Sequence, residues 1–202
     1  MPSNSCKVVK IFVEFCVQLI YKNLNIAFSP FPELKTERLL LRRLTMDDRY
    51  ELIRLRSDDR VNQYLERNKS MNINEATDFV AKIDKNLEED KSGYWVICLA
   101  ENRTLIGTIC LWHFEPEKAL VELGYELSPM YQGKGIMHEA AKAIIEYAFD
   151  TMQAKVMVAI TNPYNEPSRR VLERLDFKQD VAHYYVGAGE ADGQVVYFLL
   201  NE

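Results

Sequence analysis

The segment from residue 119 to residue 161 places the strongest constraint on how this chain can fold. An apolar strand, ALVELGYEL (119–127), leads through the turn SPMYQGKG (128–135) into a helix that runs from about Gly135 to Thr151. Apolar side chains recur along this helix at helical spacing and form one broad buried stripe. They are Ile136, Met137, Ala140, Ala141, Ile144, Ile145, Ala148 and Phe149. A second strand, KVMVAIT (155–161), follows, so the segment is a strand–helix–strand crossover.

The rest of the chain alternates between strand-like and helix-like runs. Further strands are expected at 38–44, 94–100, 105–114, near 177–186 and at 194–200. Further helices are expected from the N-cap residue Thr45 to about Ser57, and over 58–65, 72–90 and 165–175. The turn ENRT joins the strands 94–100 and 105–114 into a hairpin. Both faces of the central strands carry apolar side chains, so we predict an α/β fold (α+β, mixed sheet) with helices on both faces.

The N-terminal residues precede every motif and are treated as an extension. Residues 7–21 are apolar, but Glu14 and Gln18 interrupt the run and no A-x-A-type cleavage site follows. The run is also too short for a membrane span. We expect an N-terminal extension at 1–28, dispensable for transfer chemistry, and one domain at 29–202.

Charge and cysteine usage narrow the class of partner. The formal net charge is −5 and there is no long run of Lys and Arg, so no nucleic-acid partner is expected. The four cysteines form no CxxC pair and no zinc-like spacing with the three histidines, so no metal is expected. Cys98 and Cys110 fall inside apolar runs, as free buried thiols do. A reducing cytosol suits such thiols, and we therefore expect a cytoplasmic protein.

The turn before the helix at 135–151 has the chemistry of an anion site. Gly133 and Gly135 permit positive φ or close approach of a ligand to the backbone, and Lys134 adds a cation. The unpaired N–H groups of a helix N-terminus attract phosphate. The pattern is neither a Walker loop nor a dinucleotide fingerprint. Two glycines in an ordinary tight turn remain an equally good interpretation of these residues alone.

Two ordered motifs resemble those of a known family. QGKGIM (132–137) resembles the pyrophosphate loop of the GNAT superfamily, Gln/Arg-x-x-Gly-x-Gly/Ala, from which only Met137 departs. NPYNEPSRRVLERLDF (162–177) resembles the Asn-x-x-Ser…Leu-Gly-Phe segment of the Rim-type branch, which acetylates the N-termini of ribosomal proteins. Asn165 and Ser168 match, and Asp176 replaces the glycine in a left-handed position that Asp tolerates. The resemblance covers roughly residues 35–201.

The resemblance implies a fold and a set of roles. The fold would be GNAT-like, mostly antiparallel with a central parallel splay, and acetyl-CoA would bind in the splay as cosubstrate. Backbone groups near Leu127 would hold the pantetheine arm, and Asn165 would hydrogen-bond it. Ser168 would protonate the departing thiolate. The pyrophosphate would lie against Gln132, Gly133, Lys134, Gly135, Ile136 and Met137. The acceptor would be a protein N-terminal amine, for which a ribosomal protein is one candidate, or a small-molecule amine, and the resemblance is consistent with a homodimer.

The chemistry of amine acetylation agrees with the absence of an evident protein nucleophile. An amine attacks the thioester directly, so the protein supplies positioning, carbonyl polarisation and removal of one proton. Glu122 and Glu126 lie on one face of their strand, and either can be the general base. By resemblance Glu122 is the first choice. Solvated or paired structural carboxylates are an equally weighted alternative, and Tyr164 is a reserve proton donor.

Two other functions remain open from the sequence. One is a polyamine or antibiotic acetyltransferase of the same fold. The other is a non-catalytic acyl-CoA-binding module that keeps the cleft. The acceptor itself is not readable, because loops line that side of the site and loops vary freely.

Overall fold

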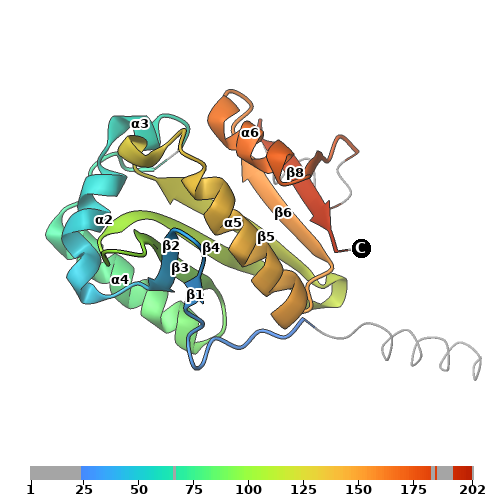
Figure 1. The fold of residues 1–202 in the computed structure, drawn as a ribbon, viewed down its shortest axis with the longest axis horizontal. Coiled ribbons are helices and arrows are strands. Elements are labelled where there is room, and N and C mark those ends of the chain that lie inside the picture. The colour runs from blue at the N-terminus through green and yellow to red at the C-terminus, as the bar shows by residue number, and fades with distance from the viewer. Residues whose placement is uncertain (1–23, 66, 183–184, 186–192, 202) are drawn as a thin grey trace, which may run out of the picture.

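A computed structural model of the chain describes residues 24–65, 67–182, 185 and 193–201 (Figure 1). Its centre is an eight-stranded sheet in the order β1-β2-β3-β4-β5-β6-β8-β7. The strands are β1 (Leu34–Lys35), β2 (Leu39–Arg43), β3 (Gly93–Leu99), β4 (Leu105–Glu115), β5 (Leu120–Leu127), β6 (Val156–Thr161), β7 (Lys178–Gln179) and β8 (Val195–Leu200). The helices are α2 (Arg49–Arg56), α3 (Asp59–Asn62), α4 (Ile73–Glu88), α5 (Ile136–Glu146) and α6 (Glu166–Arg174). A π-turn, Tyr147–Thr151, extends α5.

The sheet is mixed, and the one parallel pairing among the described strands is short. Leu120–Glu122 of β5 pairs with Val156–Val158 of β6, and the two strands separate beyond that point. On the outer sides pairing continues, because β4 follows β5 to Leu127 and β8 follows β6 to Thr161. The backbone edges that β5 and β6 turn toward each other beyond Glu122 and Val158 therefore lack a strand partner. The expected parallel splay at the centre of the sheet is confirmed.

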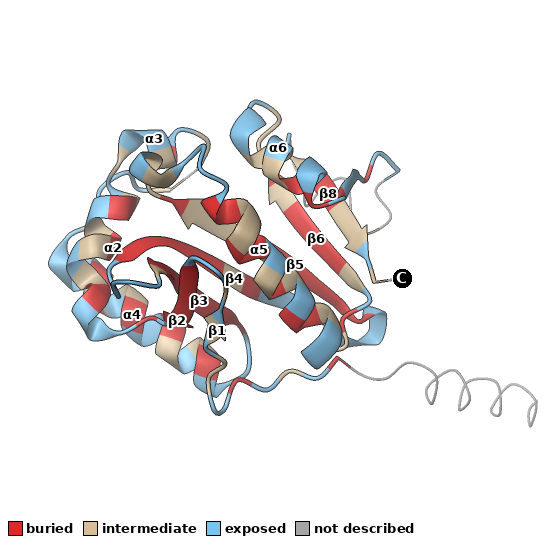
Figure 2. Cartoon of the chain, viewed as in Figure 1, coloured by how far each residue is buried: buried red, intermediate tan, exposed pale blue. Residues whose placement is uncertain are grey.

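Helices cover both faces of the sheet, as the apolar strands predict. Helices α2 and α4 pack on one face against Leu40, Tyr94, Val96 and Cys98. Helix α5 and the end of α6 pack on the other face, against Trp95, Ile109, Val121 and Leu123. Figure 1 shows α5 lying along the near face of the sheet, and Figure 2 shows the central strands buried and the outer helix surfaces exposed.

Side-chain caps and a left-handed residue fix the helix ends near the site. The Asn165 side chain accepts a hydrogen bond from the Ser168 N–H and so caps α6. At the other end of α6, Asp176 has φ +64°, and the Phe177 N–H donates to the Leu172 carbonyl. Asp176 thus adopts the left-handed conformation that its place in the motif predicts. Helix α4 begins at the cap Asn72.

The structure differs from the sequence-based prediction near both ends of the chain. The core extends back to Leu24, and Phe28 packs beside Trp95, so residues 24–28 belong to the packed domain although the sequence assigns them to the extension. The helix-like run 7–21 lies outside the described residues. The first strand of the last hairpin contains only Lys178–Gln179, so the expected strand near 177–186 is too long, because the chain turns at Val181 and Ala182. Residues 183, 184 and 186 of that expected strand lie outside the described residues. Within the part of the chain that the structure describes, no helix is long and apolar enough to cross a membrane.

Candidate active site

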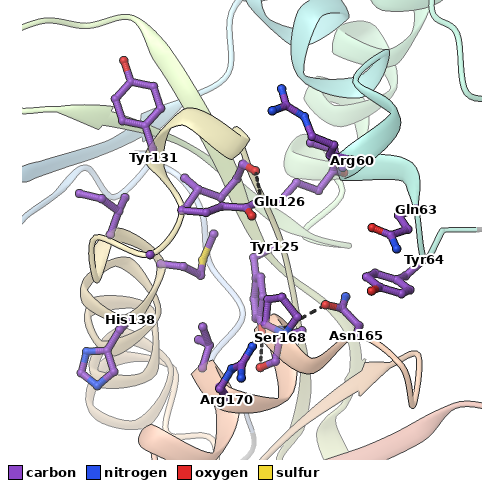
Figure 3. A pocket seen from close by; sticks show the side chains of 18 of the residues that line it. Arg60, Gln63, Tyr64, Tyr125, Glu126, Tyr131, His138, Asn165, Ser168 and Arg170 are labelled. Carbon is purple, nitrogen blue, oxygen red and sulfur yellow. Dashed lines mark hydrogen bonds between the residues drawn. The ribbon is translucent and has the colours of Figure 1, made fainter.

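A cleft of about 730 Å³ opens where β5 and β6 separate (Figure 3). Its walls are α3 with the segment after it, the end of β5, the turn that leads into α5, and the first turns of α6. A volume of this size is in the range of small-molecule and cofactor sites. Eight of the residues expected to bind acetyl-CoA or act on it line the cleft, namely Leu127, Gln132, Gly133, Gly135, Ile136, Met137, Asn165 and Ser168.

In the turn that leads into α5, two glycines leave the backbone accessible from the cleft. Gly133 and Gly135 have φ of +72° and +74°, so both occupy the conformation that favours glycine. The first hydrogen bond within α5 runs from the Glu139 N–H to the Gly135 carbonyl, which leaves the N–H groups of Ile136 and Met137 without a helical acceptor. Together with the helix dipole, these groups suit a phosphate.

Arg38 supports this turn from behind. Its Nη1 donates to the Lys134 carbonyl at 3.0 Å, and its Nε donates to the Glu139 carboxylate at 2.6 Å. The Glu139 carboxylate also accepts from the Thr36 hydroxyl at 2.5 Å. Lys134 itself is exposed and does not line the cleft, although the sequence predicts that it binds the pyrophosphate. Its Nζ lies 5.6 Å from the centre of the Tyr131 ring.

Gln132 ties the turn to the end of β5. Its side-chain amide donates to the Leu127 carbonyl at 3.0 Å, so the glutamine of the motif fixes the path of the chain between strand and helix. The Leu127 carbonyl is therefore already paired, and the backbone groups left for a pantetheine arm are those of β5 that face the splay.

Ser168 lies on the opposite wall, in the first turn of α6. Its Oγ is 2.9 Å from the Oη of Tyr125, which extends from β5 across the splay (Figure 3). Burial raises the pKa of Tyr125 to about 12, although the hydrogen bond with Ser168 opposes the rise. The serine expected to protonate a leaving thiolate is thus joined to a hydroxyl on the other wall.

Glu126 lines the cleft but is bound by two arginines. Its carboxylate accepts from Arg56 at 2.9 Å and from Arg67 at 2.8 and 2.9 Å. Burial favours the neutral acid, but these two cations outweigh it and hold the pKa of Glu126 below its usual value. A carboxylate whose charge is this well stabilised is a poor proton acceptor at neutral pH.

Glu122 lies outside the cleft lining, although it shares a strand face with Glu126. Four residues along a strand correspond to roughly 13 Å. The Glu122 side chain is buried, with its Oε2 3.4 Å from His113 Nδ1. Burial raises the pKa of Glu122, and His113 and Trp112 partly oppose this. Glu122 therefore has the pKa shift that suits a base, without direct access to the cleft.

Three arginines of the cleft were not anticipated. Arg60 lies in α3, and Arg170 and Arg174 lie one turn apart on α6. The spacing of Arg170 and Arg174 in RRVLER places both on one helix face, which was a usable signal for phosphate recognition. Tyr164, the reserve proton donor, is 79% exposed and does not line the cleft. Among the described residues, no group of three or more His, Cys, Asp or Glu is arranged to hold a metal ion.

Comparison with known proteins agrees with this geometry. Residues 38–178 match the acetyltransferase (GNAT) domain family. The uncharacterised N-acetyltransferase p20 of Bacillus licheniformis is 29% identical over 147 residues, which are 73% of this chain and 83% of the relative. The ribosomal protein uS5-alanine N-acetyltransferase of Escherichia coli is 38% identical over 58 residues, 29% of this chain and 30% of that enzyme.

Solved structures share the fold over most of the chain. A putative ribosomal-protein-serine acetyltransferase from Vibrio cholerae superposes with a TM-score of 0.70 at 22% identity, covering 85% of this chain and 99% of that one. The splayed sheet, the glycine turn before α5 and the family match over residues 38–178 agree. This chain therefore belongs to the GNAT family of N-acetyltransferases, enzymes that use acetyl-CoA.

Proposed function

We propose that this chain transfers the acetyl group of acetyl-CoA to the α-amine of a protein N-terminus. The observation that carries the proposal is the cleft in the β5–β6 splay, where the glycine turn, Asn165 and Ser168 face one space. The N–H groups at the start of α5 bind the pyrophosphate, and Arg170 and Arg174 are placed to meet further phosphate charge.

The acceptor class follows from charge and from one relative. Arg60, Arg170 and Arg174 line the cleft, although Arg60 pairs with Asp58 and Arg170 pairs with Glu166. Among the described residues of the lining the one acid is Glu126, and its charge is offset by Arg56 and Arg67. The lining therefore offers no unpaired carboxylate to a polycation, which argues against a polyamine acceptor. The similarity to the uS5-alanine enzyme supports a protein N-terminus, with a ribosomal protein as the first candidate.

Ser168 donates a proton to the sulfur as the carbon–sulfur bond breaks. An α-amine has a pKa near 8, about two units below that of a lysine side chain, so a useful fraction is neutral in the cytosol. Removal of its proton after attack requires little from the protein. Glu122 remains the carboxylate proposed for that step, and because it does not line the cleft it would act through a chain of water molecules.

An acetyl-CoA thermal-shift assay followed by an amine panel tests the proposal. Acetyl-CoA at a hundred times its dissociation constant should stabilise the fold by about 2.7 kcal/mol. Release of the CoA thiol is then measured with peptides that begin with Ala or Ser, with the same peptides N-terminally blocked, with spermidine and with an aminoglycoside. We expect turnover of the free peptides only. Binding without turnover of any amine would favour the acyl-CoA-binding module, and no thermal shift would end the proposal.

The remaining assignments are also proposals. A cytoplasmic location is supported by the free thiols of Cys98 and Cys110. The absence of a nucleic-acid partner rests on the net charge of −5. A homodimer is expected by resemblance to the family, and sedimentation of the purified chain would test it.

A further inference from the structure

The hydroxyls of Tyr125 and Ser168 join the two walls of the splay. Tyr125 belongs to β5, and Ser168 belongs to α6, beyond β6. Their Oη and Oγ atoms are 2.9 Å apart at the point where the strands no longer pair (Figure 3). Either oxygen has the geometry to donate, so the direction of this bond decides where the hydrogen of Ser168 points.

The surroundings of Tyr125 favour the tyrosine as the donor. Burial raises the pKa of Tyr125 to about 12, so the phenol keeps its proton across the physiological range. Its Oη also lies 3.4 Å from the Ser168 main-chain carbonyl, which can only accept. A hydrogen on Tyr125 Oη that points toward α6 can be accepted by both the Oγ and the main-chain carbonyl of Ser168. The hydroxyl hydrogen of Ser168 would then be free to point toward the sulfur of acetyl-CoA, which can accept it.

We propose that Tyr125 is the positioning residue for Ser168: by donating its hydroxyl hydrogen to Ser168 Oγ, it turns the serine hydrogen toward the leaving sulfur. This inference rests on the proposed function and deepens it. Tyr125 acts through Ser168 and stabilises the negative charge that the serine oxygen acquires as its proton moves to sulfur.

The step balances with the groups named. The amine nitrogen bonds to the acetyl carbonyl carbon, the carbon–sulfur bond breaks, and its electron pair goes to sulfur. The sulfur takes the hydroxyl hydrogen of Ser168. The nitrogen loses one proton, which restores the serine hydroxyl through solvent. Tyr125 keeps its proton throughout, so both side chains end as they began.

A double-mutant cycle tests whether Tyr125 acts through Ser168. Tyr125→Phe keeps the ring and removes the oxygen. We expect it to lower kcat about tenfold, the factor that one hydrogen bond to a developing charge is worth, with little change in KM for acetyl-CoA. In the Ser168→Ala background, Tyr125→Phe should have no further effect. Ser168→Thr retains a hydroxyl, and in that background Tyr125→Phe should again lower kcat.

Tyr147→Phe is the matched control for loss of a tyrosine hydroxyl. Tyr147 is buried, packs on Trp95 and lies outside the cleft, so its variant should keep the wild-type kcat. The acetyl-CoA thermal shift, measured on every variant, reports folding and binding separately from turnover.

Two results overturn the inference while the proposed function stands. One is wild-type kcat in Tyr125→Phe, and the other is an equal loss from Tyr125→Phe in the wild-type and Ser168→Ala backgrounds, which indicates a structural role independent of Ser168. Absence of turnover by the wild-type chain with every amine overturns both the inference and the proposed function.

Discussion

At the scale of single residues, the site depends most on two glycines whose conformation only glycine adopts at little cost. Gly133 and Gly135 both have positive φ, but their surroundings differ. A Cβ at Gly133 would meet nothing within 4 Å, whereas a Cβ at Gly135 would lie 3.5 Å from Arg38 Nη2, the side chain that supports the turn. Any other residue at position 135 would therefore be strained by its backbone conformation, and its Cβ would be in van der Waals contact with Arg38.

We predict that Gly135→Val abolishes most of the stabilisation by acetyl-CoA. The branched Cβ strains the backbone at φ +74° and blocks the approach of phosphate to the N–H groups of α5. The control is Gly193→Val, which imposes the same substitution at φ +71° with nothing within 4 Å. Both variants should lose stability, by about 1–3 kcal/mol. Only Gly135→Val should lose the acetyl-CoA thermal shift, and equal shifts in the two variants would contradict the assignment of this turn.

The proton steps give a second prediction at this scale. If the acceptor is an α-amine, Ser168→Ala should lower kcat by about 10- to 1000-fold, because the thiolate loses its donor. Glu122→Gln should cost less, since a neutral amine needs little help and Glu122 does not line the cleft. Profiles of kcat/KM against pH for both variants provide the measurement. A larger loss in Glu122→Gln, recovered at high pH, would instead indicate a lysine-like acceptor and a working base.

At the scale of elements, alternation along a strand predicts which face of the sheet a side chain occupies, but it does not predict which residues of other elements contact that side chain. It places Glu122 and Glu126 on one face of β5, where they pair with Trp112 and Thr108 of β4 on either side of the Cys110–Gly124 pair. Which of them reaches the cleft depends on α2 and on the segment after α3, which bring Arg56 and Arg67 onto Glu126. Those contacts join positions about 60 to 70 residues apart, and no local pattern in the chain encodes them.

We predict that Glu126→Gln destabilises the fold by about 3 kcal/mol at pH 7, because two largely buried arginines lose their counter-charge. The pKa of Glu126 is lowered in the folded state. The contribution of ionised Glu126 to the unfolding free energy is therefore fully present above the usual carboxyl pKa of about 4.3. It is lost as the pH falls through the lowered pKa that Glu126 has in the folded protein. The difference in unfolding free energy between wild type and variant should thus shrink below about pH 4.

Urea unfolding at several pH values measures this difference. The matched control is Asp84→Asn, which breaks an arginine–carboxylate pair with Arg43 at the surface, where the side chains are 46% and 33% exposed. That loss should stay below about 1 kcal/mol. Equal losses in the two variants would show that burial adds nothing to the stability contributed by the pairing of Glu126 with Arg56 and Arg67.

At the scale of the whole molecule, hydrophobic periodicity predicted that helices cover both faces of the sheet, and the family resemblance predicted that β5 and β6 separate. The apolar stripe of α5 and the two-sided strands predicted helices on both faces, and the strand bounds agree within about two residues over β2 to β6. Periodicity alone could not show that β5 and β6 part after three pairs, because separation reflects the packing of α5 and α6 rather than a local pattern. The sequence also did not reveal where the packed domain begins, since the short apolar run Leu24, Ile26, Ala27 and Phe28 forms neither a helix nor a strand.

The packed domain begins at residues that the sequence assigns to the N-terminal extension. Phe28 is 2% exposed, with its ring centre 5.9 Å from that of Trp95 and 6.0 Å from that of Phe114. Leu24 is buried beside it in the same core, and the Asn25 N–H donates to the Met152 carbonyl. Deleting residues 1–28 should therefore lower the unfolding free energy by about 5 kcal/mol or more, the sum expected for losing one Leu and one Phe from a core. Deleting residues 1–23 keeps every one of these contacts and should therefore lower the unfolding free energy less than the deletion of residues 1–28 does.

Urea unfolding of the two truncated chains distinguishes the domain boundaries directly. Neither Leu24 nor Phe28 lines the cleft, so whatever fraction of the shorter chain remains folded should still bind acetyl-CoA. A large loss of stability with retained binding would place the structural boundary of the domain near residue 24, although the residues from 24 to 28 take no part in cofactor binding. Equal stability of the two truncations would mean that the aromatic cluster around Trp95 closes without Phe28. Loss of binding by folded protein lacking residues 1–28 would give the segment a part in the site itself.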